Sequence, residues 1–227
     1  MVQKEVPFID IHTHRKTLQP ESETLLLTYG VHPWFLKPSS LSFLENLLKE
    51  DQIVAIGETG LDRLHRDSWP LQLDYFEKHI LLSEQYQKPL IIHNVKASAE
   101  ILHLHKRCQP RQAWIIHGFN GTADEARQFT DRGIYLSVGE SLYYPNRKIT
   151  KSIFSLSLDH LFLETDTSEK TIMEIYDKAS ALLNIPPDAL KNQIFVNFAA
   201  LWKTGNNVPD CSSAMMALRN LDEAMCL

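Results

Sequence analysis

The sequence predicts an α/β domain built on a parallel sheet. Short runs of Ile, Leu and Val alternate along the chain with longer segments of helical periodicity, the order expected of βαβ units. Several runs are continuous rather than alternating, as in strands that are buried on both faces. The length of 227 residues suits one full-sized domain, since about 150 residues per domain is usual.

Seven strands are expected, each an apolar run bounded by polar or turn-forming residues. In chain order they are Phe8–Ile11, Leu25–Gly30, Ile53–Gly57, Leu90–Ile92, Trp114–Ile116, Ile134–Val138 and Leu161–Leu163.

The segments between them predict helices with one apolar face. Pro70 suits the first turn of its helix, and Gly133 stands where a helix would stop. The expected helices are Leu41–Glu50, Pro70–Gln87, a helix that starts at the capping-box pair Thr122 and Glu125, Thr171–Leu183 and Pro187–Lys203.

A change in composition after residue 203 predicts the end of the main domain. Thr204–Ser213 is rich in Gly, Asn and Pro, so residues 1–203 are expected to form the domain and residues 204–227 a tail. Within the tail, Ala214–Leu227 has apolar residues at helical spacing. We expect a short helix packed on the outside of the domain, or alternatively a helix that binds a partner.

Composition excludes several classes of protein. Apolar residues make up 44% and charged residues 22%, which is ordinary for a globular protein. No apolar run is long enough for a membrane span, and no secretory signal is evident at the N-terminus. The three cysteines, Cys108, Cys211 and Cys226, are expected to be free thiols in the cytoplasm. The net charge of −5 argues against a broad basic face for duplex DNA, and nothing indicates an oligomeric state.

The pair His12 and His14 follows the first strand and predicts a metal site. Residues i and i+2 of an extended chain point the same way, so the two imidazoles project together. Neutral imidazole is a good ligand for Zn, Fe, Ni or Mn. On its own the pair is equally consistent with two solvated or core histidines.

Four further strands end in a residue that can bind a metal. Glu58, His93, His117 and Asp166 each follow one of the apolar runs. The carboxyl ends of parallel strands meet at one face of a barrel, which is where active sites lie. Buried polar groups need partners, and a shared metal supplies them.

Together these motifs resemble the TatD-type deoxyribonuclease family of metal-dependent hydrolases, from about residue 7 to residue 203. The segments that carry the resemblance, in order, are His12-x-His14, Gly30-Val-His32-Pro33, Gly57-Glu58-Thr-Gly60-Leu-Asp62, Ile91-Ile-His93-Asn94, His117-Gly-Phe119-Asn-Gly121 and Leu163-Glu-Thr-Asp166.

The resemblance implies a distorted TIM-type barrel that binds one or two divalent ions, Mg, Mn or Zn. It assigns His12, His14 and Asp166 to one ion and His93 and His117 to the other, with Glu58 as the bridge between them. A carboxylate can span two ions about 3.5–4 Å apart, the usual separation in two-metal hydrolytic sites. Asp166 is then expected to orient the attacking water and take its proton.

Two further residues are expected to contact substrate. His32 would bind phosphate or donate a proton, the alternative being simple packing beside Pro33 and Trp34. Lys96 stands near the position where the family usually has Ser-Arg-Asp, and it would replace a phosphate-binding arginine as a point charge. The family also differs at Arg15–Lys16 and Thr167–Ser168, and these changes put the substrate rather than the metal ligands in doubt.

The leading hypothesis is a metal-dependent hydrolase that cleaves phosphodiester bonds in short or single-stranded nucleic acid. Trp34, Phe119, Tyr143 and Tyr144 follow strand ends and would stack bases, the alternative being aromatic residues that only cover loops. The alternatives are a hydrolase of an amide or ester bond in a small metabolite, favoured by a deep pocket without a basic rim, and a non-catalytic scaffold.

The spacing of the first motifs predicts a missing β/α unit. Only residues 15–31 separate His14 from His32, where the family normally has a helix, a strand and a further helix. We therefore expect a seven-stranded or gapped barrel, with the deletion between Ile11 and Leu25, a loop over Arg15–Thr24 and a widened metal cleft.

Overall fold

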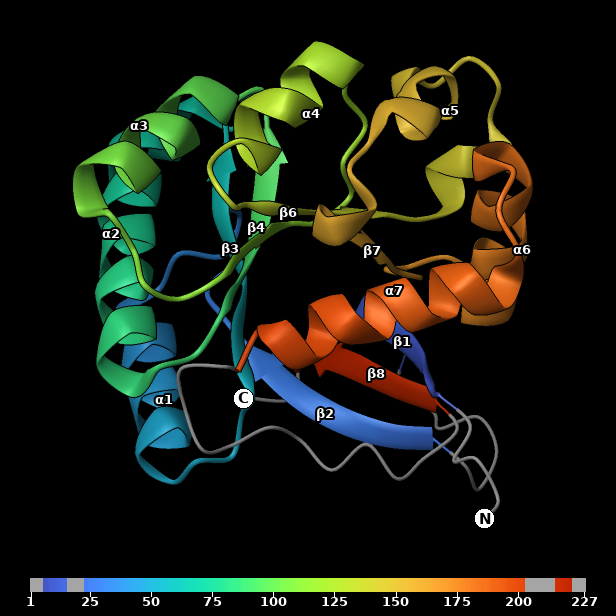
Figure 1. Ribbon diagram of the computed structural model, residues 1–227. Coiled ribbons are helices and arrows are strands. Elements are labelled where there is room, and N and C mark those ends of the chain that lie inside the picture. The colour runs from blue at the N-terminus through green and yellow to red at the C-terminus, as the bar shows by residue number, and fades with distance from the viewer. Residues whose placement is uncertain (1–5, 16–22, 203–214, 222–227) are drawn as a thin grey trace.

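Eight strands form one parallel sheet in the computed structural model, which describes residues 6–15, 23–202 and 215–221 (Figure 1). All seven expected strands are present, but the predicted count of seven is wrong. In sheet order the strands are β1 (Phe8–Thr13), β8 (Met215–Asn220), β2 (Glu23–Tyr29), β3 (Ala55–Asp62), β4 (Leu90–Val95), β5 (Trp114–Ile116), β6 (Tyr135–Val138) and β7 (Leu161–Leu163).

The two outer strands of the sheet, β1 and β7, meet at their carboxyl ends. The backbone N–H of His14 donates to the carbonyl of Asp166 at 3.0 Å, and the N–H of Asp166 donates to the carbonyl of His12 at 3.0 Å. Thr13 and Asp166 form an isolated parallel bridge there. The sheet is therefore a nearly closed barrel, which confirms the expected TIM-type fold.

The eighth strand corrects the prediction for the C-terminal tail. Met215–Asn220 is a strand between β1 and β2, not a helix on the outside of the domain. Met216, Ala217 and Leu218 are fully buried, as expected of a strand covered on both faces. The physical reason is that β1 and β2 would otherwise each leave an unpaired edge, and pairing those edges outweighs a local helical pattern.

This strand also fills the gap that the sequence analysis expected in the barrel. β2 already begins at Glu23, and residues 16–22 of the expected loop lie outside the described residues. In the sheet, β8 takes the place between β1 and β2, so the expected widening of the metal cleft by an open gap is wrong.

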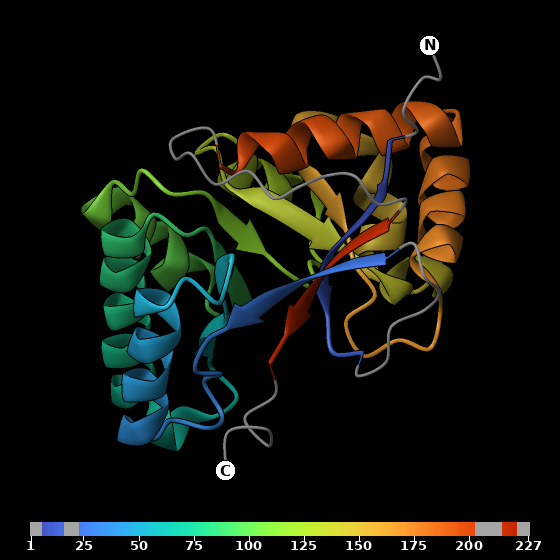
Figure 2. The ribbon, with the colours of Figure 1, turned by 90° about the horizontal axis from the view of Figure 1, so that it is seen from below.

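Seven α-helices surround the described part of the barrel, with α1 to α3 on one side and α6 and α7 on another (Figures 1 and 2). Two capping boxes fix helix starts, one at Thr122 as predicted and one at Thr171. The helices are α1 (Pro38–Lys49), α2 (Trp69–Tyr86), α3 (Ser98–Cys108), α4 (Ala123–Thr130), α5 (Lys148–Ser152), α6 (Ile172–Leu183) and α7 (Pro187–Ala200).

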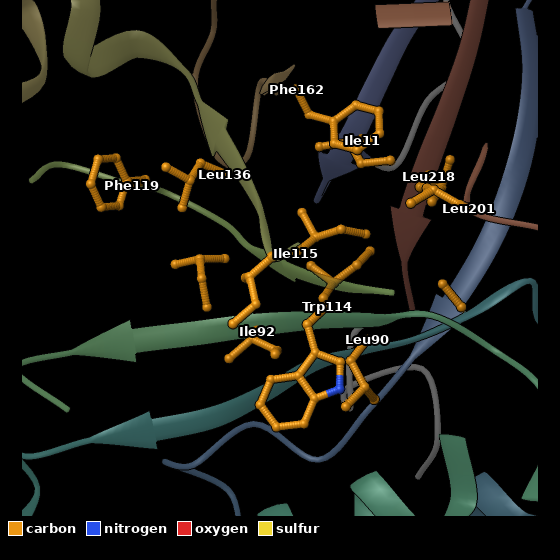
Figure 3. Packing of buried hydrophobic residues seen from close by; sticks show 14 of the residues in the cluster. Ile11, Leu90, Ile92, Trp114, Ile115, Phe119, Leu136, Phe162, Leu201 and Leu218 are labelled. Carbon is orange, nitrogen blue, oxygen red and sulfur yellow. The ribbon is translucent and has the colours of Figure 1, made fainter. Parts of the chain in front are cut away.

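The core consists of branched and aromatic side chains from the strands and the helices around them. Figure 3 shows residues from neighbouring and opposite strands packed together, among them Ile11, Ile92, Ile115 and Leu218. Each of these four is completely buried. Leu218 comes from the C-terminal strand, so that strand contributes to the core as well as to the sheet.

None of the described helices is long and apolar enough to cross a membrane. Cys108 is an exposed free thiol, while Cys211 and Cys226 lie outside the described residues.

Candidate metal centre

The carboxylate of Glu58 lies at the centre of a group of five histidines. Its Oε2 lies 3.5 Å from Nε2 of His12 and 3.4 Å from Nε2 of His14. Its Oε1 lies 2.7 Å from Nδ1 of His93 and 2.7 Å from Nε2 of His117. The two oxygens therefore face two different groups of imidazoles, as a bridging carboxylate must.

Asp166 joins the first of these groups. Its Oδ1 lies 3.8 Å from Nε2 of His12 and 3.6 Å from Nε2 of His14. The bridge between β1 and β7 described above holds Asp166 beside the two histidines. All six residues predicted as metal ligands are thus brought together at the carboxyl ends of the strands.

His32 joins the second group, which the sequence analysis did not foresee. Its Nε2 lies 3.3 Å from Oε1 of Glu58, and its ring packs against that of His93. Ligand atoms of His32, Glu58 and His93 lie within 4.8 Å of one another, as do those of His12, His14 and Glu58. His32 is therefore positioned as a candidate ligand of the second group, while its predicted contact with substrate stays a prediction.

The geometry and burial of the first group, His12, His14, Glu58 and Asp166, fit a divalent ion. His12 is fully buried, and neither of its ring nitrogens has a hydrogen-bond partner within the described ranges. Leaving both unsatisfied is costly, and such atoms in native proteins usually have a partner. The separations of 3.4–3.8 Å between His12 or His14 and the carboxylates are close to the ~3.4 Å between tetrahedral ligands ~2.1 Å from a shared ion.

Two further carboxylates lie on the far side of the candidate histidine ligands from Glu58. Asp62 Oδ2 lies 3.5 Å from Nε2 of His93, and Glu164 Oε1 lies 3.7 Å from Nδ1 of His117. Glu164 also accepts a hydrogen bond from the backbone of Gly118 at 2.7 Å. Carboxylates that contact the second nitrogen of a ligating histidine fix its ring orientation and raise its basicity.

Asp62 and Glu164 belong to the sequence motifs described above, but no role was predicted for either. The available signal was their place beside a candidate ligand, because Asp62 ends the Gly-Glu-Thr-Gly-Leu-Asp segment and Glu164 stands two residues before Asp166. Asp10 has a similar place before His12. Its carboxylate accepts hydrogen bonds from the backbone N–H and hydroxyl of Thr165, at 2.9 and 2.6 Å, and so ties β1 to the segment that carries Asp166.

Glu58 and His117 each shift the pKa of the other. Burial alone would raise the pKa of Glu58, but His117 and the other imidazoles hold it well below its usual range. Burial alone would lower the pKa of His117, but Glu58 and Glu164 raise it well above its usual range. The carboxylate is thus ionised and ready to bind a cation, which would take the place of the proton on His117.

The cluster opens into a cavity of about 660 Å³. One wall is aromatic, formed by Tyr29, Trp34, Phe35 and Phe43. Trp34 and Phe35 are each 50% exposed, so they are available to a ligand. The indole N–H of Trp34 donates to Asp62 at 2.7 Å, which links this wall to the metal cluster.

Lys96 does not lie in this cavity. It is an exposed residue that follows β4, and it is not among the described residues that line the cavity. Lys37, just before α1, does line the cavity. The role predicted for Lys96 in binding phosphate therefore has no support from its position.

Comparison with known proteins identifies relatives that share the family and the fold of this chain. Residues 5–203 match the family described as TatD related DNase. An uncharacterized metal-dependent hydrolase of Haemophilus influenzae is 29% identical over 204 residues, which is 79% of this chain and 78% of that protein. Another, from Buchnera aphidicola, is 30% identical over 164 residues, which is 67% of this chain but only 62% of that protein.

The fold is also similar to a solved structure. The crystal structure of YjjV, a TatD homologue from Escherichia coli, has a TM-score of 0.75 to this chain at 22% identity, over 86% of this chain and 97% of that one. With the family match over residues 5–203 and the histidine and carboxylate cluster at the strand ends, the chain belongs to the TatD family of metal-dependent hydrolases.

Proposed function

We propose that the chain hydrolyses phosphodiester bonds at the end of a short or single-stranded nucleic acid, with one or two divalent ions bound by the Glu58 cluster. The observation that carries the proposal is the division of the two Glu58 oxygens between two imidazole groups. Ions bound in this way polarise a phosphoryl oxygen and lower the pKa of a bound water.

The protein's own residues would divide the remaining work. His12 and His14 face one oxygen of Glu58 and also lie beside Asp166, and His32, His93 and His117 face the other oxygen. Burial and nearby Glu164 raise the pKa of Asp166. Asp166 would orient the attacking water and accept its proton.

The shape of the cavity supports a short substrate. Half-exposed Trp34 and Phe35 form a surface on which a base could stack beside the metal cluster, and base stacking on an aromatic ring contributes about 1–3 kcal/mol. His32 lies between this wall and Glu58: its Nδ1 accepts a hydrogen bond from the backbone N–H of Trp34 at 3.2 Å, and its Nε2 lies 3.3 Å from Glu58 Oε1. The net charge of −5 does not favour tracking along a duplex.

One observation favours a second candidate, the hydrolysis of an amide or ester bond in a small molecule. Lys37 is the single lysine or arginine among the described residues that line the cavity, and much of the wall is aromatic. A site that binds a polyanion usually presents several cations. The same ligands would activate water for either reaction.

The test is an assay of the purified protein with Mg²⁺ or Mn²⁺ and an end-labelled single-stranded oligonucleotide. Glu58→Gln and Asp166→Asn are expected to lower cleavage at least about 100-fold, since each removes a ligand and one a proton acceptor. Glu45→Gln, a change of an exposed acid on α1, is the matched control and is expected to cleave normally.

Nitrophenyl esters and N-acyl amino acids are assayed in parallel. Failure on every oligonucleotide, together with metal-dependent turnover of one of these compounds that requires Glu58, would replace the nuclease assignment with the second candidate.

A further inference from the structure

Asn220 ends the C-terminal strand β8 and lies beside the metal centre. β8 pairs with β1, which carries His12, and with β2, which leads to His32. Asn220 is in register with Thr28 of β2, and the next residue, Leu221, donates its N–H to the carbonyl of Thr28 at 2.8 Å. Both Asn220 and Leu221 line the 660 Å³ cavity.

The side chain of Asn220 contacts the backbone of Glu58. The N–H of Glu58 donates to Oδ1 of Asn220 at 3.2 Å, and the asparagine is 8% exposed. This hydrogen bond joins residues 162 positions apart in the chain. It therefore links the last described strand of the protein directly to the carboxylate residue at the centre of the cluster.

The strand ladders leave Glu58 in need of such a partner. The pairing of β2 with β3 stops at Tyr29 and Ile56, and the pairing of β3 with β4 shifts between Ile56 and Thr59. Glu58 falls within that irregularity, where regular sheet pairing does not fix its backbone. A buried N–H needs an acceptor, and Asn220 supplies it.

We propose that Asn220 is a positioning residue of the metal centre: it holds the backbone of Glu58 so that the two carboxylate oxygens point to the two imidazole groups. The proposal rests on the metal-binding role of Glu58 given above. Asn220 lies beyond residue 203, where the match to the family ends, so the family match assigns no residue to this task. The C-terminal strand thereby becomes part of the active site as well as of the barrel.

Calorimetric titration with Mn²⁺ tests this role without relying on activity. Asn220→Leu keeps the size of the side chain but removes the acceptor, and we expect Mn²⁺ affinity to fall about 10- to 100-fold, the usual effect of losing an outer-shell partner. Asn220→Asp keeps an acceptor oxygen and is expected to bind at least as tightly as the wild type. If the leucine variant does not fold, Asn220→Ala takes its place, because it removes the same acceptor and leaves a smaller side chain.

Asn197→Leu is the matched control. Asn197 is also buried, and its amide donates to the carbonyls of Leu158 and Leu161, at the amino end of β7 and away from the cluster. This variant is expected to lose stability but to keep its Mn²⁺ affinity.

Three outcomes would overturn the proposal. Wild-type Mn²⁺ affinity in the folded leucine or alanine variant would show that the hydrogen bond does not matter. Equal losses of affinity in the aspartate and leucine variants would show that the lost acceptor is not the cause.

A wild-type protein that does not bind Mn²⁺ would instead contradict the metal centre itself. Failure of the Asn220 role and failure of the metal centre are therefore distinguishable.

Discussion

At the scale of single residues, the site depends on one carboxylate and on the groups that hold it. Glu58 contacts imidazoles from β1, β4 and the segments that follow β2 and β5. Its charge is maintained in spite of burial because those imidazoles surround it. Removing the carboxylate would leave several buried ring nitrogens facing one another without a counter-charge, so both the metal and the arrangement of the histidines should be lost.

The six candidate ligands could be found in the sequence because each follows an apolar strand. The residues that contact these candidate ligands from other strands could not be predicted. Asp62, Glu164 and Asn220 acquire roles only when strands far apart in the chain lie in a given register. His32 was singled out, but its place beside Oε1 of Glu58 depends on how the segment after β2 turns back toward β3.

A buried histidine outside the cluster predicts a pH dependence of stability. His79 on α2 is fully buried, accepts a hydrogen bond from the N–H of Val31 at 3.0 Å, and contacts the carbonyl of Tyr75 at 2.6 Å. Burial lowers its pKa to about 4. Between an unfolded pKa of about 6.5 and the folded value, the unfolded chain binds a proton that the folded chain does not.

The contribution of His79 is therefore present above pH ~6.5 and is lost as the pH falls toward about 4. From pH 7.5 to pH 5, we expect the wild type to lose about 2 kcal/mol more stability than His79→Gln, whose amide oxygen can accept from Val31 without titrating. Urea unfolding of both proteins at the two pH values measures the difference. Equal losses in both would contradict it.

At the scale of elements, β3 and β4 approach each other closely where they carry Glu58 and His93. Gly60 has a φ of +136°, and a Cβ at this position would lie 2.2 Å from the carbonyl oxygen of His93. Any side chain here must push the two strands apart. The close approach explains why the Gly-Glu-Thr-Gly segment contains a glycine at this point.

Gly60→Ala is therefore expected to lower the free energy of unfolding by about 3 kcal/mol or more. The substitution combines an unfavourable backbone conformation with a collision between the new Cβ and the carbonyl oxygen of His93. Gly133→Ala is the matched control, since Gly133 has a φ of +74° but no atom within 4 Å of the added Cβ. Gly133→Ala should lower the free energy of unfolding by only about 1 kcal/mol, because it has the unfavourable backbone conformation without the collision. Free energies of unfolding in urea measure both, and equal costs would show that the strand contact is not tight.

Element boundaries could be predicted where hydrophobicity alone decides them. β5 and β7 have the predicted bounds, Trp114–Ile116 and Leu161–Leu163. β3 was expected at Ile53–Gly57 but covers Ala55–Asp62, because its polar second half is buried by the site and pairs with β4. A hydrophobic pattern does not reveal a strand whose polar residues are satisfied by functional partners.

At the scale of the whole molecule, the barrel is completed by a strand from the far end of the chain. The sequence analysis correctly found too little chain between His14 and His32 for another β/α unit before β2, but it assigned the C-terminal residues to the outside of the barrel. Local spacing in Ala214–Leu227 favoured a helix, whereas the strand forms because two distant strands offer it paired edges. Such long-range pairing leaves no local signal in the sequence.

A chain that ends at residue 203 should therefore fail to form the native barrel, although it contains the whole family match. It would expose the facing edges of β1 and β2 and lose the buried Met216 and Leu218. We expect it to lack a cooperative urea transition and near-ultraviolet circular dichroism. A chain that ends at Leu221 keeps β8 and is the matched control; cooperative unfolding of both chains would refute the structural role of the strand.

We propose that Glu58 holds one or two divalent ions between the two imidazole groups at the carboxyl ends of the strands. Anomalous diffraction from crystals grown with Mn²⁺ tests it most directly. With two ions bound, two peaks about 3.5–4 Å apart are expected, one beside His12, His14 and Asp166 and one beside His32, His93 and His117; with one ion bound, a single peak within bonding distance of a Glu58 oxygen is expected. No peak at Glu58, or a single ion bound away from it, would contradict the account.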